Sequence, residues 1–176
     1  MRLRRLTARA RLDAGFGLIE LLIAMGVMSI GIMAVFGMFE AGIVQIRRAS
    51  AVTTASALAD TEMEGFRAIR YDSIGLADAA VVATDSTYKA DTAYDSASAN
   101  RVNLPVCGTA PCTSSVPSQN KVGADNRQYR VDIYVTWQTV TNGRNVKRVT
   151  VVVRDGGTPT KVYARSASSF DQSTGI

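Results

Sequence analysis

The sequence predicts an α+β fold in which one long N-terminal helix packs on a small antiparallel β-sheet. Residues 16–70 contain no proline, and they combine an apolar block with apolar side chains that recur at helical intervals. Residues 129–138 instead alternate between two faces, as strands do, and turn residues separate them from two further β-rich runs. A chain of 176 residues is long enough for one domain with its own core.

The composition excludes several kinds of catalytic site. The chain has no histidine and two cysteines, so it cannot by itself supply a His-based triad, a His-ligated zinc or a four-thiolate metal site. The sequence also has no nucleophile elbow and no phosphate-binding loop. We therefore expect a protein that is not an enzyme and that holds no cofactor and no metal.

The first element is an apolar stretch over residues 16–39, whose only charge is Glu20. It is long enough to span a bilayer as a helix, which takes about 20 apolar residues. Five arginines and one aspartate precede it in residues 1–15, which thereby carry most of the net charge of +5. By the positive-inside rule, the N-terminus is expected in the cytoplasm and the chain after residue 40 outside it.

A cleaved secretory signal is the alternative interpretation, with an A-x-A site at Ala49-Ser50-Ala51. However, the apolar stretch exceeds the roughly 7–15 residues of a signal-peptide core, and Arg47-Arg48 lies where a neutral approach to the site is expected. A twin-arginine signal at Arg4-Arg5 has less support still. A membrane segment that stays attached is the favoured interpretation.

Glu20 is the informative residue of the stretch, because a carboxylate at mid-bilayer costs about 2.5–3.5 kcal/mol unless it finds a partner. A cut between Gly15 and Phe16 would place a new α-amine four residues before Glu20, and this amine would carry positive charge at neutral pH. In an assembly, Glu20 of one subunit could pair with the amine of its neighbour. Alternatively, Glu20 reaches the membrane surface without a partner.

The run Gly15-Phe16-Gly17-Leu18-Ile19-Glu20, with its basic leader and long apolar helix, resembles the class III signal of type IV prepilins. The resemblance implies a leader peptide over 1–15, cleavage after Gly15 by prepilin peptidase, N-methylation of Phe16 and a role for Glu20 in assembly. Residues 16–46 would then form the transmembrane and assembly helix. The implied fold is pilin-like.

The resemblance also implies partners and a location. The partners are prepilin peptidase, other pilin subunits that bind through the N-terminal helix, and an inner-membrane assembly platform. Before assembly the chain would cross the inner membrane once, and afterwards it would lie in a surface or periplasmic filament. Residues 55–75 are similar to minor pilins of the PilV type and to pseudopilins of type II secretion, which favours a minor subunit. Two features depart from major pilins: Gly37 replaces a helix proline, and no disulfide can form near the C-terminus.

Residues 47–75 are expected to form the amphipathic second half of the helix. Six apolar residues recur there at three- and four-residue spacing, namely Val52, Ala55, Ala59, Met63, Phe66 and Ile69. The opposite face, with residues such as Thr53, Asp60 and Glu64, is expected in solvent. Within the membrane half, Gly17, Ala24 and Gly31 lie seven apart and would let another helix approach closely, although glycine is also simply common in membrane helices.

Residues 76–128 are expected to be a variable connecting region, rich in small and polar residues. Asp85, Asp91 and Asp95 could bind calcium, but they lack EF-hand spacing and are better explained as a solvated loop. Cys107 and Cys112 are expected to form a disulfide, because exported thiols are normally oxidised. Such a bridge closes a short loop and would stabilise the fold by only about 2 kcal/mol.

Residues 129–176 are expected to form an antiparallel β-meander. Tyr129, Val131, Ile133, Val135 and Trp137 fall on one face of the first strand, and we expect that face to be buried under the helix. Asn142-Gly143 predicts a tight hairpin turn, residues 145–154 a second strand, the turn at 155–159 a reversal, and residues 160–165 a third strand.

The basic C-terminal region supports an alternative function, in which a pilin-like DNA-uptake subunit binds nucleic acid. Six cations contribute to this hypothesis, namely Arg127, Arg130, Arg144, Lys147, Arg148 and Arg154. Tyr129, Tyr134 and Trp137 are interleaved with them, as in single-strand binding proteins. Because strand periodicity places Tyr129 and Trp137 on the expected core face, we rank this function below a structural subunit.

Overall fold

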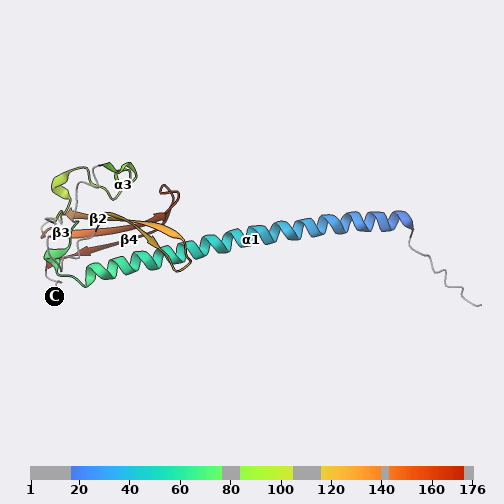
Figure 1. The fold of residues 1–176 in the computed structure, drawn as a ribbon, viewed down its shortest axis with the longest axis horizontal. Coiled ribbons are helices and arrows are strands. Elements are labelled where there is room, and N and C mark those ends of the chain that lie inside the picture. The colour runs from blue at the N-terminus through green and yellow to red at the C-terminus, as the bar shows by residue number, and fades with distance from the viewer. Residues whose placement is uncertain (1–16, 77–83, 105–115, 140–142, 173–176) are drawn as a thin grey trace, which may run out of the picture. The chain divides into compact units, whose positions relative to one another are not determined.

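The computed structural model describes residues 17–76, 84–104, 116–139 and 143–172. Its regular elements run from a long helix α1, through short helical turns, to four strands, β1 to β4 (Figure 1). The chain divides into two compact units, Met1–Ile46 and Arg47–Ile176, which are described separately below as the N-terminal and C-terminal units. The α+β class predicted from the sequence is confirmed.

Helix α1 comprises Leu18–Arg67, close to the helix predicted over residues 16–70. It begins where the carbonyl of Gly17 accepts hydrogen bonds from the N–H groups of Glu20 and Leu21, at 3.0 and 3.2 Å. Its last turn carries an ion pair between Arg67 and Glu64. A 3-10 turn, η1, follows at Tyr71–Ser73, so the helix ends before residue 75, the expected end of its amphipathic half.

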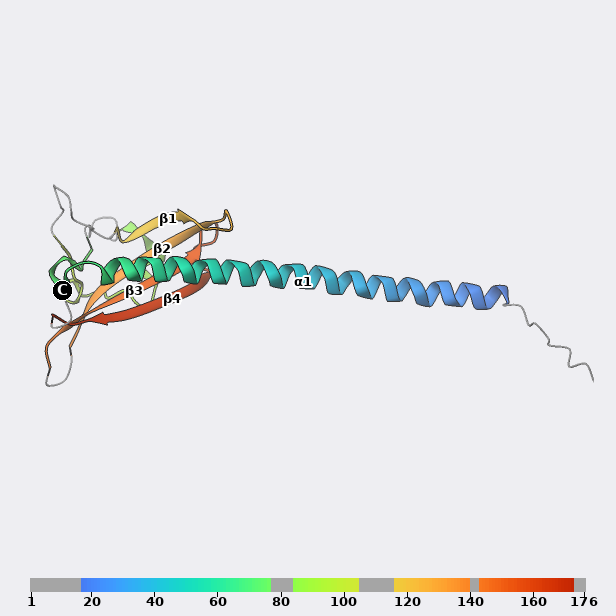
Figure 2. The ribbon, with the colours of Figure 1, turned by 90° about the horizontal axis from the view of Figure 1, so that it is seen from below.

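Four antiparallel strands form one sheet in the order β1-β2-β3-β4 (Figure 2). Their bounds are Ser118–Val122 for β1, Gln128–Gln138 for β2, Val146–Asp155 for β3 and Val162–Phe170 for β4. The last three match the predicted strands to within a few residues at each end, except that β4 runs to Phe170. Strand β1 was not predicted, because its sequence, Ser-Gln-Asn-Lys-Val, is polar and has no apolar alternation.

One face of the sheet packs against α1. The helix buries Ala51, Ala55, Ala59, Met63 and Phe66, which lie on one face at three- and four-residue spacing. They meet the inward side chains of the two central strands, which are Tyr129, Val131, Ile133, Val135, Val149, Val151 and Val153. The predicted helix face is therefore confirmed, except that Ala51 takes the place expected for Val52, which is exposed.

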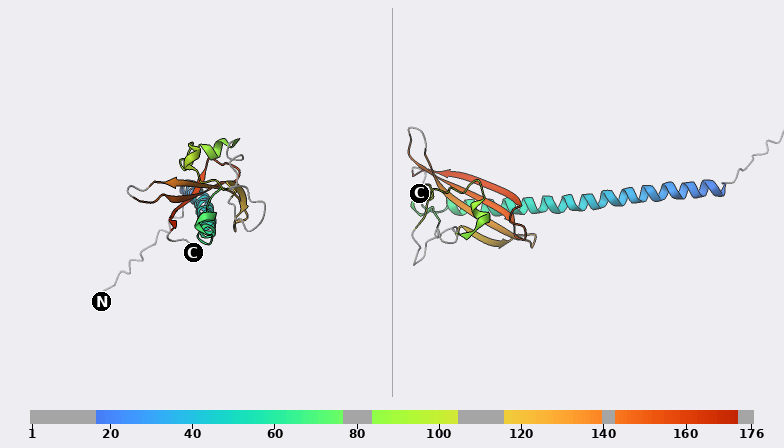
Figure 3. Two further views of the ribbon diagram at one scale, coloured as in Figure 1. Left: turned by 90° about the vertical axis from the view of Figure 1, so that its left-hand side faces the viewer. Right: turned by 90° about the horizontal axis from the view of Figure 1, so that it is seen from above.

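The other face of the sheet is covered as well, which corrects the prediction that the meander buries a single face. Helix α3, Ser86–Lys89, and residues 90–94 lie on this face, and a 3-10 turn η2, Ser98–Asn100, follows. Residues 101–103 pair with Thr136 and Leu76, and Val102 belongs to the core under α1. Figure 3 shows α3 and the C-terminal part of α1 on opposite sides of the strands. Tyr88, Tyr134 and Val152 form a second, smaller core there.

Trp137 also departs from the prediction, because its side chain is 37% exposed rather than in the core. It lies near the end of β2, two residues after Val135, the last residue of this strand in the core. The Nζ atom of Lys147, its cross-strand neighbour, lies 5.5 Å from the centre of the indole ring.

The turn between β1 and β2 brings the sheet into contact with α1. The N–H of Gly123 donates to the carbonyl of Arg127 at 2.9 Å, and Asn126 has a left-handed φ of 59°. A Cβ on Gly123 would lie 2.5 Å from the methyl of Thr54 and 2.7 Å from the ring of Tyr129. Only glycine therefore fits where the turn meets the helix. The expected bridge between Cys107 and Cys112, and the Asn142 position of the next hairpin, lie outside the described residues.

Candidate functional site

The N-terminal unit presents an apolar segment, residues 18–46 of α1, to its surroundings. Each of its residues is exposed, and its large apolar side chains range from 45% exposed at Ile32 to 78% at Leu18. Monomeric proteins in water rarely expose apolar patches of more than a few hundred Å². The segment therefore requires a lipid or protein environment that the chain itself does not provide.

Glu20 lies in the first turn of the apolar segment. Its position favours a carboxylate, because the free N–H groups of a helix start attract negative charge. Among the described residues, the carboxylate of Glu20 makes no hydrogen bond and no ion pair. Glu40 is the other acid of the segment and lies near its far end. The expected cleavage residues Gly15 and Phe16 precede the described part of the chain.

Four glycines of the apolar segment make no close contact with any described residue. At Gly26, Gly31, Gly37 and Gly42, an added Cβ would find nothing within 4 Å. Glycine weakens a helix by up to about 1 kcal/mol relative to alanine, and no contact with the described residues offsets this cost at the four positions. The hydroxyl of Ser29 donates to the carbonyl of Met25 at 2.8 Å and so satisfies itself within the helix.

Helix α1 is long and apolar enough to cross a membrane, by length and composition. Residues 10–36 match a family model described as "Prokaryotic N-terminal methylation motif". The chain carries the class III signal of type IV pilins. The long apolar helix and the four-stranded sheet that follow this signal form a pilin-like α+β arrangement. No curated protein and no solved structure matches the chain.

The pilin-like motif fits a membrane-anchored protein that is processed by prepilin peptidase and assembles with other pilins. Proteins with this motif are structural subunits rather than a class of enzymes. The matched residues include Gly15, Phe16 and Glu20, the positions that the sequence analysis assigned to cleavage, methylation and assembly. These three roles are taken up below as proposals.

In the C-terminal unit, a row of ion pairs crosses the second face of the sheet. It alternates three carboxylates with three guanidinium groups, in the order Asp85, Arg130, Asp132, Arg154, Asp91 and Arg165. Asp132 is fully buried and accepts hydrogen bonds from Arg130 at 2.8 Å and from Arg154 at 2.9 Å. Asp91 accepts from Arg154 and, through its two oxygens, from Nη2 of Arg165 at 2.8 Å.

This ion-pair row holds residues 85–91 on strands β2, β3 and β4. Burial alone would raise the pKa of Asp91, but the N–H of Ala93 and the guanidinium groups of Arg165 and Arg154 lower it below its ordinary value of 3.8. Burial also opposes ionisation of Asp85, and the N–H of Tyr88 and the guanidinium of Arg130 again hold its pKa low. Asp85 and Asp91 therefore stay charged at neutral pH.

The sequence analysis missed the ion-pair row because its partners are far apart in sequence, 45 residues for Asp85 and Arg130 and 74 for Asp91 and Arg165. One signal was present: Arg130 and Asp132 fall on the face of the predicted strand opposite its apolar residues. A charged residue at the centre of a strand indicates a buried partner. Asp85 and Asp91 are thus not part of a freely solvated loop.

The structure places the six cations of the nucleic-acid hypothesis in different environments. Arg130 and Arg154 belong to the ion-pair row. Lys147 is buried, and its ammonium donates to the carbonyls of Tyr71 and Ile74 at 2.8 and 2.9 Å. The other three, Arg127, Arg144 and Arg148, are exposed.

Two of the three aromatic residues in that hypothesis, Tyr129 and Tyr134, are buried. Stacking platforms for single strands require exposed rings. Half of the cations and two of the three aromatic rings in the nucleic-acid hypothesis are therefore not available to bind a nucleic acid. Within the described part of the chain, no group of three His, Cys, Asp or Glu side chains could hold a metal ion.

Proposed function

We propose that the chain is a minor structural subunit of a type IV pilus or a related pseudopilus. Prepilin peptidase cuts it after Gly15 and methylates the new amine of Phe16, and the mature chain polymerises through its N-terminal helix. The observation that carries this proposal is the apolar segment, because it is exposed over its whole length and begins within the matched methylation motif.

The proposal accounts for Glu20. A carboxylate in an apolar medium costs about 2.5–3.5 kcal/mol unless it is paired. The described chain offers Glu20 no partner, whereas the amine of Phe16 in a neighbouring subunit is positively charged at neutral pH. Pairing of the two groups between subunits would also set the axial register of one helix against the next.

The proposal also accounts for two successive environments. Before assembly, the apolar segment lies in the inner membrane, with the arginine-rich leader in the cytoplasm and the C-terminal unit outside it. During assembly, the segment leaves the bilayer for a core of identical or related helices. Glycines with open space around them permit close helix approach in that core.

The two acids of the apolar segment allow a matched test of assembly. Glu20→Gln removes the charge near the start of the segment, and Glu40→Gln removes the charge near its end. Each variant is expressed in cells that lack the wild-type chain, and filaments sheared from the surface are separated from the membrane fraction. We expect Glu20→Gln to stay in the membrane and Glu40→Gln to reach the filaments in near wild-type amounts.

Equal loss of the two variants from the filaments, or equal incorporation, would contradict a specific role for Glu20. Absence of the wild-type chain from every sheared filament would exclude a surface pilus and would leave only a periplasmic pseudopilus. The minor role has its own test, which is the molar ratio of this chain to the most abundant pilin in the same filaments. A ratio near one or above would contradict it.

A further inference from the structure

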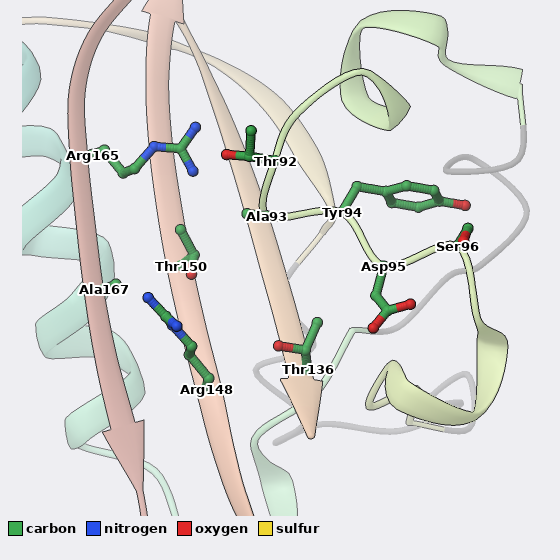
Figure 4. A pocket seen from close by; sticks show the side chains of 10 residues that line it. All are labelled: Thr92, Ala93, Tyr94, Asp95, Ser96, Thr136, Arg148, Thr150, Arg165 and Ala167. Carbon is green, nitrogen blue, oxygen red and sulfur yellow. The ribbon is translucent and has the colours of Figure 1, made fainter. Parts of the chain in front are cut away.

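The second face of the sheet is only partly covered, and a groove remains beside residues 92–96. On this face, Thr136 of β2 pairs across the strands with Arg148 of β3, and Tyr134 pairs with Thr150. Tyr88 covers Tyr134, whereas Thr136 and Arg148 lie beyond the reach of α3. Figure 4 shows the groove, whose volume is about 490 Å³ and which lies wholly within the C-terminal unit.

Two guanidinium groups line one side of the groove. Arg148 is exposed, and among the described residues it makes no ion pair and no hydrogen bond. Arg165 of β4 uses only Nη2 to bind Asp91, so its Nε and Nη1 atoms remain available. In Figure 4 the two side chains come from neighbouring strands, with Thr150 between them. Two guanidinium groups on the same side of a groove can hold a carboxylate between them, since each can bind it through N–H groups.

The opposite side of the groove carries a carboxylate held in place. Asp95 accepts hydrogen bonds from the N–H of Ala97 and from the side-chain amide of Asn100, each at 2.9 Å. The hydrogen bond from Asn100 lowers the pKa of Asp95 most, and the one from Ala97 lowers it further. Asp95 is therefore ionised at neutral pH. Each oxygen has acceptor capacity left for a hydroxyl donor. The hydroxyl groups of Thr92, Ser96 and Thr136 add further polar partners.

We propose that this groove binds a carboxylated sugar, a uronic acid unit of an acidic glycan. The sugar carboxylate contacts Arg148 and Arg165, and its ring hydroxyls donate to Asp95 and exchange hydrogen bonds with the threonine and serine hydroxyls.

Other ligand classes fit the groove less well. Asp95 would repel the second charge of a phosphate monoester, which argues against nucleotides. The ring of Tyr94 is directed away from the two arginines (Figure 4). The Cζ atom of Arg101 lies 5.3 Å from the centre of this ring, so the ring is not free to stack on a base. The lining is hydroxyl-rich and charged, which argues against an apolar ligand.

The test uses the full chain in a detergent without sugar head groups, with saturation-transfer NMR and titration as readouts. Three ligands are compared: glucuronate, glucose and inorganic phosphate. We expect saturable binding of glucuronate, and binding of glucose and of phosphate that is weaker by roughly tenfold or more. Arg148→Gln should weaken glucuronate binding by roughly tenfold, whereas Arg144→Gln, an exposed arginine outside the groove lining, should leave it unchanged.

Several results would overturn the proposal. These are no saturable binding of glucuronate, phosphate binding as tight as glucuronate binding, or an equal effect of Arg148→Gln and Arg144→Gln. Glucose that binds as tightly as glucuronate would also overturn it, because the two arginines would then contribute nothing. The proposal is independent of filament assembly, since a chain that stays in the membrane keeps the same groove.

Discussion

The ring of Tyr88 stacks on the ring of Tyr134, with 4.3 Å between the ring centroids. The two phenols also anchor each other's backbone, because Tyr88 donates to the carbonyl of Ile133 and Tyr134 donates to the carbonyl of Tyr88. Burial is the largest effect on both hydroxyls and raises the pKa of each well above 10. Both hydroxyls therefore remain neutral donors. This pair holds helix α3 on the second face of the sheet.

Loss of the Tyr88 ring should therefore destabilise the C-terminal unit. We expect Tyr88→Ala to lower the free energy of unfolding by about 3–5 kcal/mol, because it removes a fully buried aromatic ring. Tyr88→Phe keeps the stacking and loses one hydrogen bond, so about 1 kcal/mol is expected. Chemical unfolding of the full chain in detergent, followed by near-ultraviolet circular dichroism, measures both. Equal stability of Tyr88→Ala and the wild type would mean that α3 does not pack on the sheet.

The ion-pair row makes stability depend on acid. The pKa values of Asp85 and Asp91 are lower in the folded chain than their ordinary value, so folding is favoured at pH values above that ordinary value. This contribution is lost as the pH falls below about 4 and through the lowered values. We expect the thermal midpoint of the C-terminal unit to stay constant between about pH 5 and pH 7 and to fall steeply below about pH 4.

Removal of one carboxylate should flatten that acid dependence. Asp91→Asn removes one of the two carboxylates that pair with the buried guanidinium of Arg154, which keeps its pair with Asp132, and we expect a loss of about 3 kcal/mol at neutral pH. Asp85→Asn is the milder variant, because Asp85 is 26% exposed and contacts only Arg130 in the row. A thermal midpoint that falls just as steeply with acid in Asp85→Asn as in the wild type would show that this residue contributes nothing to the dependence.

Gly123 offers a test of how the sheet docks on α1. An added Cβ would lie 2.5 Å from Thr54 and 2.7 Å from Tyr129, so Gly123→Ala should cost about 1–3 kcal/mol through forced displacement. Gly157→Ala is the matched control, because its Cβ would meet only Asp155 Oδ1, at 3.5 Å. Unfolding titrations of the two variants should differ accordingly. If Gly157→Ala were the more destabilising, the close approach at Gly123 would be wrong.

Gly31 tests the apolar segment independently of the C-terminal unit. Because nothing lies within 4 Å of its added Cβ, Gly31→Leu should leave the unfolding of the C-terminal unit unchanged. We expect the same change to lower the share of the chain found in sheared filaments, since a large side chain blocks close helix approach. Met33→Leu, a swap between apolar residues of similar size, is the control. Full incorporation of Gly31→Leu would show that the small residue is not required.

Local patterns in the sequence were enough to predict α1 and the three strands β2, β3 and β4. Helical spacing identified Ala55, Ala59, Met63 and Phe66, and strand alternation identified most of the core face of β2, because each pattern depends on neighbours within a few residues. The turn at Asp155 was also predictable, and its carboxylate accepts from the N–H groups of Gly157 and Thr158.

The features that sequence reasoning missed depend on distant partners. Strand β1 is polar and is held by its pairing with β2, and by the ion pair of Lys121 with Glu62 on α1. The cover over the second face depends on Tyr88 meeting Tyr134 from 46 residues away. The groove lined by Arg148 and Arg165 depends on residues 92–96, which lie opposite these two arginines although they are more than 50 positions away in sequence. No local pattern encodes such juxtapositions.

The central claim is that the chain is a prepilin cut between Gly15 and Phe16. It is tested most directly by the intact mass and N-terminal sequence of the membrane-associated protein, from cells with and without prepilin peptidase. The account predicts a mature chain that begins with N-methylated Phe16 in normal cells and an uncut chain when the peptidase is absent. An uncut chain that begins at Met1 in normal cells, or a chain that begins near Val52, would contradict it.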